Sequence, residues 1–260
     1  TRFAAGQSDG ASAMVGRQQE LALLLDRWRQ AKAGEGQMVV LTGEAGIGKS
    51  RIMSALIESV APDDHLRISY QCSPYHTDSA LYPASQQLTY AAGFVADEGP
   101  ESKLDKLEHL LHQGRDDIAI ATSVLGALLG LGEVAEARHG TLELSPQERR
   151  AQTLQALLEQ LTGAAATRPV LFVLEDAHWI DPTTLELLEL ALEQIGDHRV
   201  MLLITARPTF NHGFGGHPIV LRLALNRLGR KHVIGIVERI TKGKALPPEL
   251  LDEIAAKADG

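Results

Sequence analysis

The sequence is poor in cysteine and in aromatic residues, and it has no long hydrophobic run. Its one cysteine, Cys72, cannot form a disulfide within the chain, and no cysteines and histidines have the spacing of a structural zinc site. Aromatic residues make up only 4% of the 260 residues, which favours helices packed on a sheet over an aromatic-rich β-sandwich. No run reaches the roughly 18 apolar residues that span a bilayer, and the N-terminus lacks a signal-peptide pattern. We therefore expect a cytoplasmic protein.

Positive charge is also scarce. The formal net charge is −8 and the pI is about 5.7, whereas broad nucleic-acid binding needs clustered Lys and Arg to neutralise phosphates. Anionic membrane surfaces are disfavoured for the same reason. We expect direct contact with neither nucleic acid nor membrane.

The hydrophobic pattern alternates between short apolar runs and stretches with helical spacing. Short runs of this kind are typical of buried parallel strands, and they predict strands over residues 37–43, 65–72, 169–176, 199–208 and 218–228. Helical spacing predicts helices over 18–32, 51–60, 84–92, 102–113, 117–131, 146–161, 181–195, 231–240 and 247–258. The alternation indicates an α/β fold.

A glycine-rich loop between a predicted strand and helix is the strongest motif. It fits the phosphate-binding pattern G-x-x-x-x-G-K-[ST] without a mismatch, and its residues are Gly43, Glu44, Ala45, Gly46, Ile47, Gly48, Lys49 and Ser50. Glycines let backbone N–H groups turn toward phosphates, and the next helix presents its positive N-terminal end to the same anion. The alternatives are a chance glycine turn and a dinucleotide site, but the latter requires G-x-G-x-x-G.

The side chains of this loop suggest roles in binding a nucleoside triphosphate with Mg²⁺. We expect Lys49 to reach the β and γ phosphates and Ser50 to offer a hydroxyl ligand to Mg²⁺. We also expect Arg51, the next residue, to contact the nucleotide. No motif identifies the base, so the sequence leaves ATP and GTP both open.

Two carboxylates end the predicted strand 169–176. Glu175 and Asp176 follow the run LFVL in the form of a Walker B element. We expect Glu175 to contact Mg²⁺ through its water shell, and Asp176 to orient or deprotonate the attacking water; both acids are candidate metal residues. The sequence leaves open how the two acids share these roles, and acids that merely begin a loop are the alternative.

Arg207 ends the next predicted strand. In a parallel α/β sheet, ligands gather at the carboxyl ends of the strands, so Arg207 is expected to face the γ-phosphate. The alternative is a surface arginine before the turn at Pro208. Nearby, we expect Trp179 to pack rather than to act, and Asp181 to cap a helix.

Together these motifs resemble the signal-transduction ATPases with numerous domains (STAND), a branch of the AAA-like P-loop NTPases. The resemblance rests on the stretches MVGRQQELALLLDRW, VVLTGEAGIGKSR, LFVLEDAHWIDPTTLELLE and LLITARP. It implies a three-layer P-loop NTPase with about five parallel strands, helices on both faces and a short C-terminal helical lid. It also implies that Val15, Gly16 and Arg17 lie near the adenine and ribose.

The resemblance also implies a domain organisation. We expect a flexible tail over 1–13, the NTPase core over 14–228 and a helical lid over 229–260, cut off before a winged-helix domain. Effector and sensor domains would belong to the same full-length chain, and binding of ATP rather than ADP would favour self-association. The family usually has Asp where Glu175 stands, so slow hydrolysis is expected.

Three functions fit these observations. The favoured one is an ATP-binding, slowly hydrolysing regulatory switch. A nucleotide-binding scaffold that hydrolyses nothing and presents a surface to an effector is the second. A small-molecule kinase is the third, although the sequence has no signature of a second substrate pocket.

Overall fold

A parallel β-sheet forms the centre of the molecule. The computed structural model describes residues 16–112, 118–211, 214, 216–241 and 246–257. The described part contains five strands in the order β2-β3-β4-β1-β5, and every neighbouring pair is parallel. The strands are β1 (Gln37–Thr42), β2 (Leu66–Gln71), β3 (Val170–Glu175), β4 (Val200–Ala206) and β5 (Val220–Ala224). The predicted sheet of about five parallel strands is confirmed.

Alternate residues of the strands face two separate hydrophobic layers. In β1, Val39 and Leu41 belong to one buried cluster, and Met38 and Val40 belong to the other. Successive side chains point to opposite faces of a strand, so a strand covered on both faces is apolar throughout. This burial explains why β1, β3 and β4 have continuous apolar sequences.

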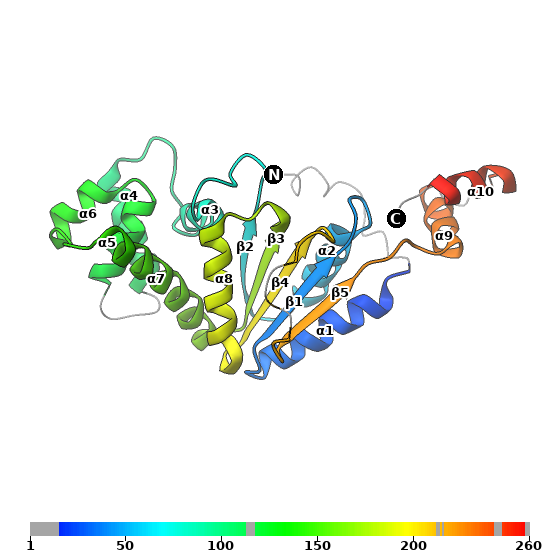
Figure 1. Cartoon of the computed structure of the whole chain (residues 1–260), viewed down its shortest axis with the longest axis horizontal. Helices are drawn as coiled ribbons and strands as arrows, with labels where there is room; N and C mark the ends of the chain where they lie inside the picture. The colour runs from blue at the N-terminus through cyan, green and yellow to red at the C-terminus, as the bar shows by residue number, and fades with distance from the viewer. Residues whose placement is uncertain (1–15, 113–117, 212–213, 215, 242–245, 258–260) are drawn as a thin grey trace.

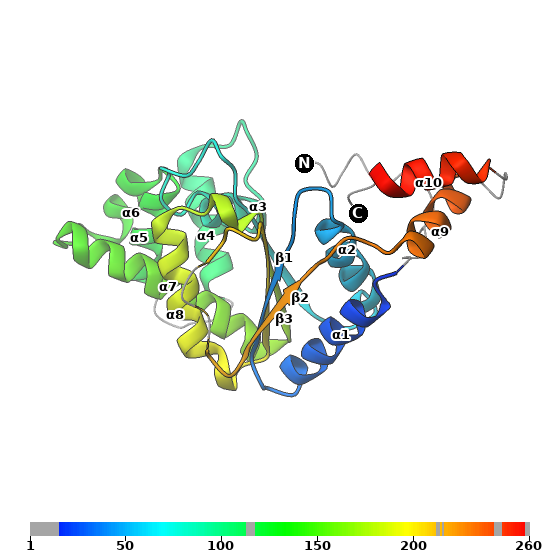
Figure 2. The same ribbon diagram turned by 45° about the vertical axis from the view of Figure 1, so that its right-hand side comes forward.

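Helices cover both faces of the sheet, which confirms the predicted three layers (Figure 2). One face packs on α1 (Gln18–Lys32) and α2 (Lys49–Val60), which contribute Leu24, Trp28 and Leu56 to its core. The opposite face packs on α3 (Tyr82–Ala91), α7 (Pro146–Thr167) and α8 (Pro182–Gln194).

A helical region lies between β2 and β3 in the chain and projects from one end of the sheet (Figure 1). Besides α3 and α7 it contains α4 (Pro100–His112), α5 (Ala119–Leu128) and α6 (Gly132–His139). The predicted single helix 117–131 is wrong at its end, because Gly130 adopts a φ of 74° that stops α5 before the short helix α6 begins. Helix α7 begins at the expected cap, where Ser145 and Glu148 form a capping box.

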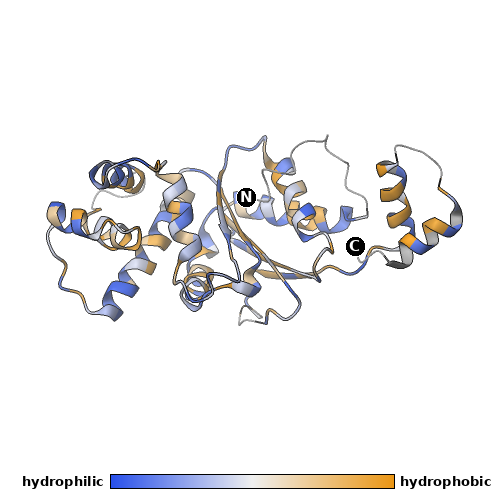
Figure 3. Cartoon of the chain, turned by 90° about the horizontal axis from the view of Figure 1, so that it is seen from above, coloured by the Kyte–Doolittle hydropathy of each residue, from blue (hydrophilic) through white to orange (hydrophobic). Residues whose placement is uncertain are grey.

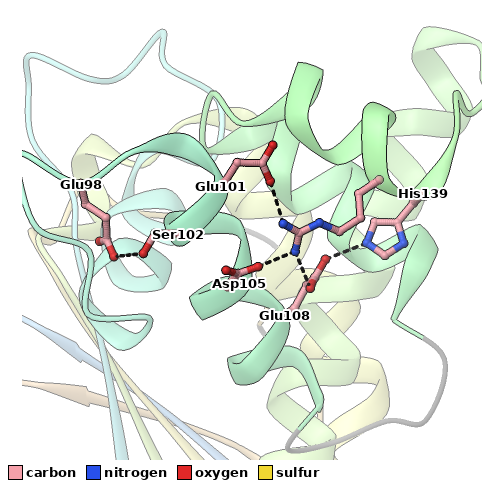
Figure 4. A network of polar contacts seen from close by, with 7 residues as sticks. Glu98, Glu101, Ser102, Asp105, Glu108 and His139 are labelled. Carbon is pink, nitrogen blue, oxygen red and sulfur yellow. Dashed lines mark hydrogen bonds and ion pairs between the residues drawn. The ribbon is translucent and has the colours of Figure 1, made fainter.

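Surface ion pairs join α6 to α4 in this region (Figure 4). Arg138 pairs with Glu101, Asp105 and Glu108, and His139 Nε2 lies 2.7 Å from Glu108 Oε1. Single exposed pairs contribute little to stability, but several carboxylates around one guanidinium form a network. The network positions α6 on α4, far from the carboxyl ends of the strands.

Two helices, α9 (Arg230–Ile240) and α10 (Pro248–Lys257), follow β5 at the opposite end from α4–α6 (Figure 3). These are the lid helices expected from the sequence. The expected domain boundaries stay a prediction, and the tail 1–13 lies outside the described residues. None of the described helices combines the length and apolar character needed to cross a membrane.

Candidate functional site

The loops that follow β1, β2, β3 and β4 meet at one edge of the sheet. Because β4 lies between β1 and β3, the phosphate-binding loop, the acidic pair and Arg207 are brought to neighbouring strand ends. A cavity of about 830 Å³ opens there, a size that suits a small-molecule ligand. Its walls are Ala45, Gly46, Gly48, Lys49, Ser50, Arg51, Gln71, Cys72, Ser73, Pro74, Tyr75, Asp176, His178, Trp179 and Arg207.

The loop after β1 has the backbone that phosphate binding requires. Gly46 and Gly48 have φ values of 80° and 101°, in the left-handed region that favours glycine. At Gly43 an added Cβ would lie 2.6 Å from Ile47 Cγ2, so the loop can close only without a side chain there. Helix α2 begins at Lys49 with no side-chain cap, which leaves its first N–H groups free for an anion.

Lys49 reaches across this loop. Its Nζ donates to the carbonyl oxygens of Gly43 and Glu44, at 2.6 and 2.7 Å. Burial lowers the pKa of Lys49, the charge of Asp176 opposes this shift, and Arg207 adds to it. Lys49 therefore lies within electrostatic reach of both Asp176 and Arg207.

The two acids at the end of β3 differ in their surroundings. Asp176 lines the cavity and has a φ of 55°, and its backbone N–H donates to Thr205 Oγ1 at 3.2 Å. Glu175 is half-buried outside the set of cavity-lining residues, and its carbonyl accepts from Cys72 N–H. The roles assigned to both acids stay predictions, and the geometry favours Asp176 for direct contact with a ligand.

Glu175 is expected to make stability depend on pH. Burial, and then the charge of Asp176, raises the pKa of Glu175 to about 7. The folded state therefore binds this proton more tightly than the unfolded state does. Protonation of Glu175 contributes fully to the free energy of unfolding below about pH 4.5, and this contribution is lost as the pH rises to about 7. In Glu175→Gln the free energy of unfolding should decrease by about 2 kcal/mol less over this pH range than in the unmodified chain, after allowance for solvent screening.

Urea unfolding of the unmodified chain and of Glu175→Gln at pH 5 and pH 8 measures this effect. The exposed Glu193→Gln on α8 is the matched control. Parallel pH profiles for the unmodified chain and Glu175→Gln would contradict the expected burial effect.

Arg207, Trp179 and His178 complete the inner wall of the cavity. The Arg207 guanidinium carbon lies 5.8 Å from the centroid of the Trp179 ring, within the range of a cation–π contact. Both ring nitrogens of His178 are buried without a hydrogen-bond partner, and burial lowers the pKa of His178. Trp179 thus holds Arg207 as well as packing on the core, a role that the sequence analysis missed.

The sequence analysis also did not predict that the segment at the end of β2 forms part of the cavity wall. Residues 71–75 line the cavity, yet no motif marks them. The predicted strand 65–72 could have indicated this segment, because parallel strands of one sheet end at the same edge.

Asp181 ties this wall to the loop after β3. It is 2% exposed and caps α8 as expected, accepting from the N–H groups of Thr183 and Thr184, each at 3.0 Å. Its Oδ1 also accepts from the N–H of Leu81 at 3.2 Å. This last contact joins the start of α3 to the start of α8, so the two loops that flank the cavity are held together.

Asp181→Ala should lower the free energy of unfolding by about 3 kcal/mol, because it removes a helix cap and leaves the buried Leu81 N–H without an acceptor. Asp181→Asn keeps the Oδ1 acceptor and should cost about 1 kcal/mol. Urea denaturation measures both. Equal losses for the two variants would contradict a role for the shared acceptor.

The structure does not bring the Gly16 and Arg17 element into the cavity. Val15 lies outside the described residues. The guanidinium of Arg17 donates to the carbonyl oxygens of Ile47 and Asn226, at 3.3 and 2.5 Å. Gly16 has a φ of 77°, and an added Cβ would lie 2.6 Å from the His232 ring of α9. The element thus links the phosphate-binding loop to the lid, and its expected place near a base and ribose stays a prediction.

A metal ion at this site would depend on the bound nucleotide. Among the described residues no group of three or more His, Cys, Asp or Glu side chains could hold a metal. Ser50 and Asp176 both line the cavity, and Mg²⁺ is commonly held by one or two protein oxygens, phosphates and water. The donor set therefore fits Mg²⁺ only together with a phosphate ligand.

The chain is similar to several solved structures, and the two described first, each with a TM-score of 0.50, share its fold. Cdc6p from Pyrobaculum aerophilum is 13% identical with a TM-score of 0.50, over 95% of this chain and 55% of that one. A chain of the E. coli MS115-1 HORMA:CdnC:Trip13 complex is 11% identical with a TM-score of 0.50, over 94% of this chain and 73% of that one. A STAND protein with a tetratricopeptide repeat sensor from Pyrococcus horikoshii is 16% identical, with a TM-score of 0.47, over 96% and 28% of the two chains.

Sequence comparisons address the family directly. An uncharacterized protein of Rhizobium meliloti (strain 1021) is 29% identical over 227 residues, which are 87% of this chain. The chain spans only 21% of the length of that relative. The family model described as AAA ATPase domain matches residues 13–204, which make up most of the chain and include every cavity-lining residue except Arg207. The chain therefore belongs to the AAA ATPase domain family.

Proposed function

We propose that this module is an ATP-dependent regulatory switch of a larger protein, which binds ATP with Mg²⁺ and hydrolyses it slowly. The observation that supports this most is the convergence of Lys49, Asp176 and Arg207 on one cavity whose floor is the phosphate-binding loop. An ammonium, a carboxylate and a guanidinium are the groups that position a triphosphate, activate water and stabilise the charge of the transferred phosphoryl group.

Each residue has a distinct step in the proposed reaction. Lys49 and the first N–H groups of α2 hold the β and γ phosphates, and Ser50 with Asp176 holds Mg²⁺. Asp176 also accepts a proton from the attacking water, whose oxygen forms a bond to the γ-phosphorus while the bond to the β–γ bridging oxygen breaks. Arg207, held against Trp179, neutralises charge on the γ-phosphoryl oxygens. The products are ADP and phosphate.

Slow turnover follows from Glu175. Burial raises the pKa of its carboxyl to about 7, so much of it is uncharged at neutral pH and is a poor partner for Mg²⁺. The site would then depend mainly on Asp176, which lines the cavity. The same feature favours the second candidate, a nucleotide-binding scaffold that does not hydrolyse ATP.

A switch also requires that ATP and ADP favour different states. A ligand shifts an equilibrium only by its differential affinity for the two states, and ATP and ADP differ by the γ-phosphate. Arg207 and Trp179 are positioned to respond to that group, and Asp181 connects their loop to α3. We infer that the ATP-bound state self-associates and acts on effector and sensor domains of the full-length chain.

Calorimetric titration of the chain with ATP, ADP and GTP in the presence of Mg²⁺, with phosphate release followed in parallel, tests the proposal. ATP binding with slow release of phosphate supports the switch. Binding without release over many hours supports the scaffold. Absence of binding by all three nucleotides would refute both.

A further inference from the structure

A second cavity, of about 170 Å³, lies in the apolar layer between the sheet and helices α3, α4, α7 and α8. It extends from the edge strand β2 to the central strand β4. Buried side chains from the sheet and from two helices form its walls, among them Tyr70, Phe172, Leu202, Leu158, Leu188 and Ala191. None of its lining residues lines the phosphate-site cavity, so the proposed nucleotide chemistry does not account for it.

This cavity reaches from the exposed residues Ala91, Thr167 and Arg168 into the buried apolar layer. Interiors are packed about as densely as organic crystals, with few voids larger than a water molecule. Side chains that line a void lose dispersion contacts, so an occupant that matches its shape is favoured. An apolar cavity of about 150 Å³ remains dry and binds benzene, so the present cavity has room for one aromatic ring with a short substituent.

Four polar residues also line this cavity. They are Gln87 of α3, Gln160 and Thr167 of α7, and Arg168, which directly follows α7. Arg168 Nη1 lies 3.9 Å from Asp64 Oδ1, and the Asp64 side chain is 92% exposed. Such a pair is weak because water screens it, so another carboxylate can replace Asp64 as the partner of Arg168 at little cost.

We propose that this cavity binds a small monocarboxylic acid with an apolar, aromatic-sized body. The body would lie among the leucines, Phe172 and Ala191, and the carboxylate would accept hydrogen bonds from the Arg168 guanidinium, a pairing with good geometric match. The cavity shares β2 and β3 with the nucleotide site: Tyr70 and Phe172 line the apolar cavity, and Gln71 and Asp176 line the phosphate cavity. Occupancy would therefore stiffen two strands that carry parts of the phosphate site.

The test uses phenylacetate and its uncharged analogue phenylacetamide as probes, titrated into the whole chain and followed by methyl NMR shifts. Phenylacetate should bind saturably with a dissociation constant of about 1 mM or lower, and phenylacetamide at least fivefold more weakly. Arg168→Gln should remove this difference. Ala191→Leu, which fills the cavity, should weaken phenylacetate binding at least tenfold.

Controls separate binding from folding. Ala166→Leu adds the same side chain at an exposed position of α7 outside the cavity and should leave binding unchanged. If thermal melting shows that Ala191→Leu is unfolded, Ala164→Leu in the half-buried wall takes its place. No saturation by 10 mM phenylacetate, or equal binding by the folded cavity-filling variant, would refute the site, and equal affinity for both probes would refute the carboxylate contact. None of these outcomes depends on whether the chain binds ATP.

Discussion

Replacing Lys49 with alanine is expected to weaken binding of Mg²⁺-ATP at least 100-fold. The Lys49 ammonium lies over the phosphate-binding loop, 2.6 Å from the Gly43 carbonyl and 2.7 Å from that of Glu44. The group is partly buried, and this burial lowers its pKa. A charge-assisted contact from such a group to phosphate contributes about 3 kcal/mol, or about 100-fold in affinity.

Calorimetry on the unmodified chain and on Lys49→Ala measures this loss. Lys103→Ala on α4 is the matched control, because it removes the same charge from a helix remote from the cavity. The thermal midpoint of Lys49→Ala should stay near that of the unmodified chain. The Gly43 and Glu44 carbonyls that accept hydrogen bonds from Lys49 belong to the loop and can accept from water instead. Affinity within threefold of the unmodified chain would refute the role of this loop in binding triphosphate.

Asp176→Asn is expected to lower the rate of phosphate release from bound ATP at least 100-fold. Asp176 has a φ of 55°, and asparagine tolerates this left-handed conformation well. The backbone N–H donates to Thr205 Oγ1, a contact that the substitution leaves in place. The variant therefore removes the negative charge, which a general base requires, without displacing the loop.

Single-turnover phosphate release with saturating Mg²⁺-ATP measures this rate. Glu175→Gln at the adjacent position is the matched comparison, and it should slow release less than tenfold. Comparable losses in both variants would show that the acids act as a unit. A large loss only in Glu175→Gln would reverse the two assignments.

The residues behind these two predictions differ in how directly the sequence indicates their place in the site. The phosphate-binding loop is a contiguous motif, and its strand, glycines and helix were all expected at nearly the observed residues. Asp176 and Arg207 were expected from the ends of two apolar strands, and the structure places both at the cavity. Their nearness to Lys49 depends on β4 lying between β1 and β3, an order that no local pattern specifies.

Other parts of the site depend on contacts between distant segments. Arg17 was expected near the nucleotide base, but its guanidinium contacts Asn226, 209 positions away in the chain. Asp181 was predicted as a cap, whereas its contact with Leu81 spans 100 positions. Trp179 was expected only to pack, and its contact with Arg207 joins residues 28 positions apart in the chain. Hydrogen bonds and cation–π contacts over such separations have no periodic signal in the sequence.

The sequence by itself determined the strands, most of the helices and the phosphate-binding motif: apolar runs that are buried on both faces become parallel strands, and a G-x-x-x-x-G-K-S loop can turn its N–H groups inward in only a few ways. Tertiary structure alone decided which strand ends meet, which of the two acids faces the cavity, and where an apolar hollow remains between sheet and helices. The physical reason is that backbone conformation and hydrophobic periodicity are local, whereas strand order, desolvation and packing voids depend on residues that folding brings together from distant parts of the chain.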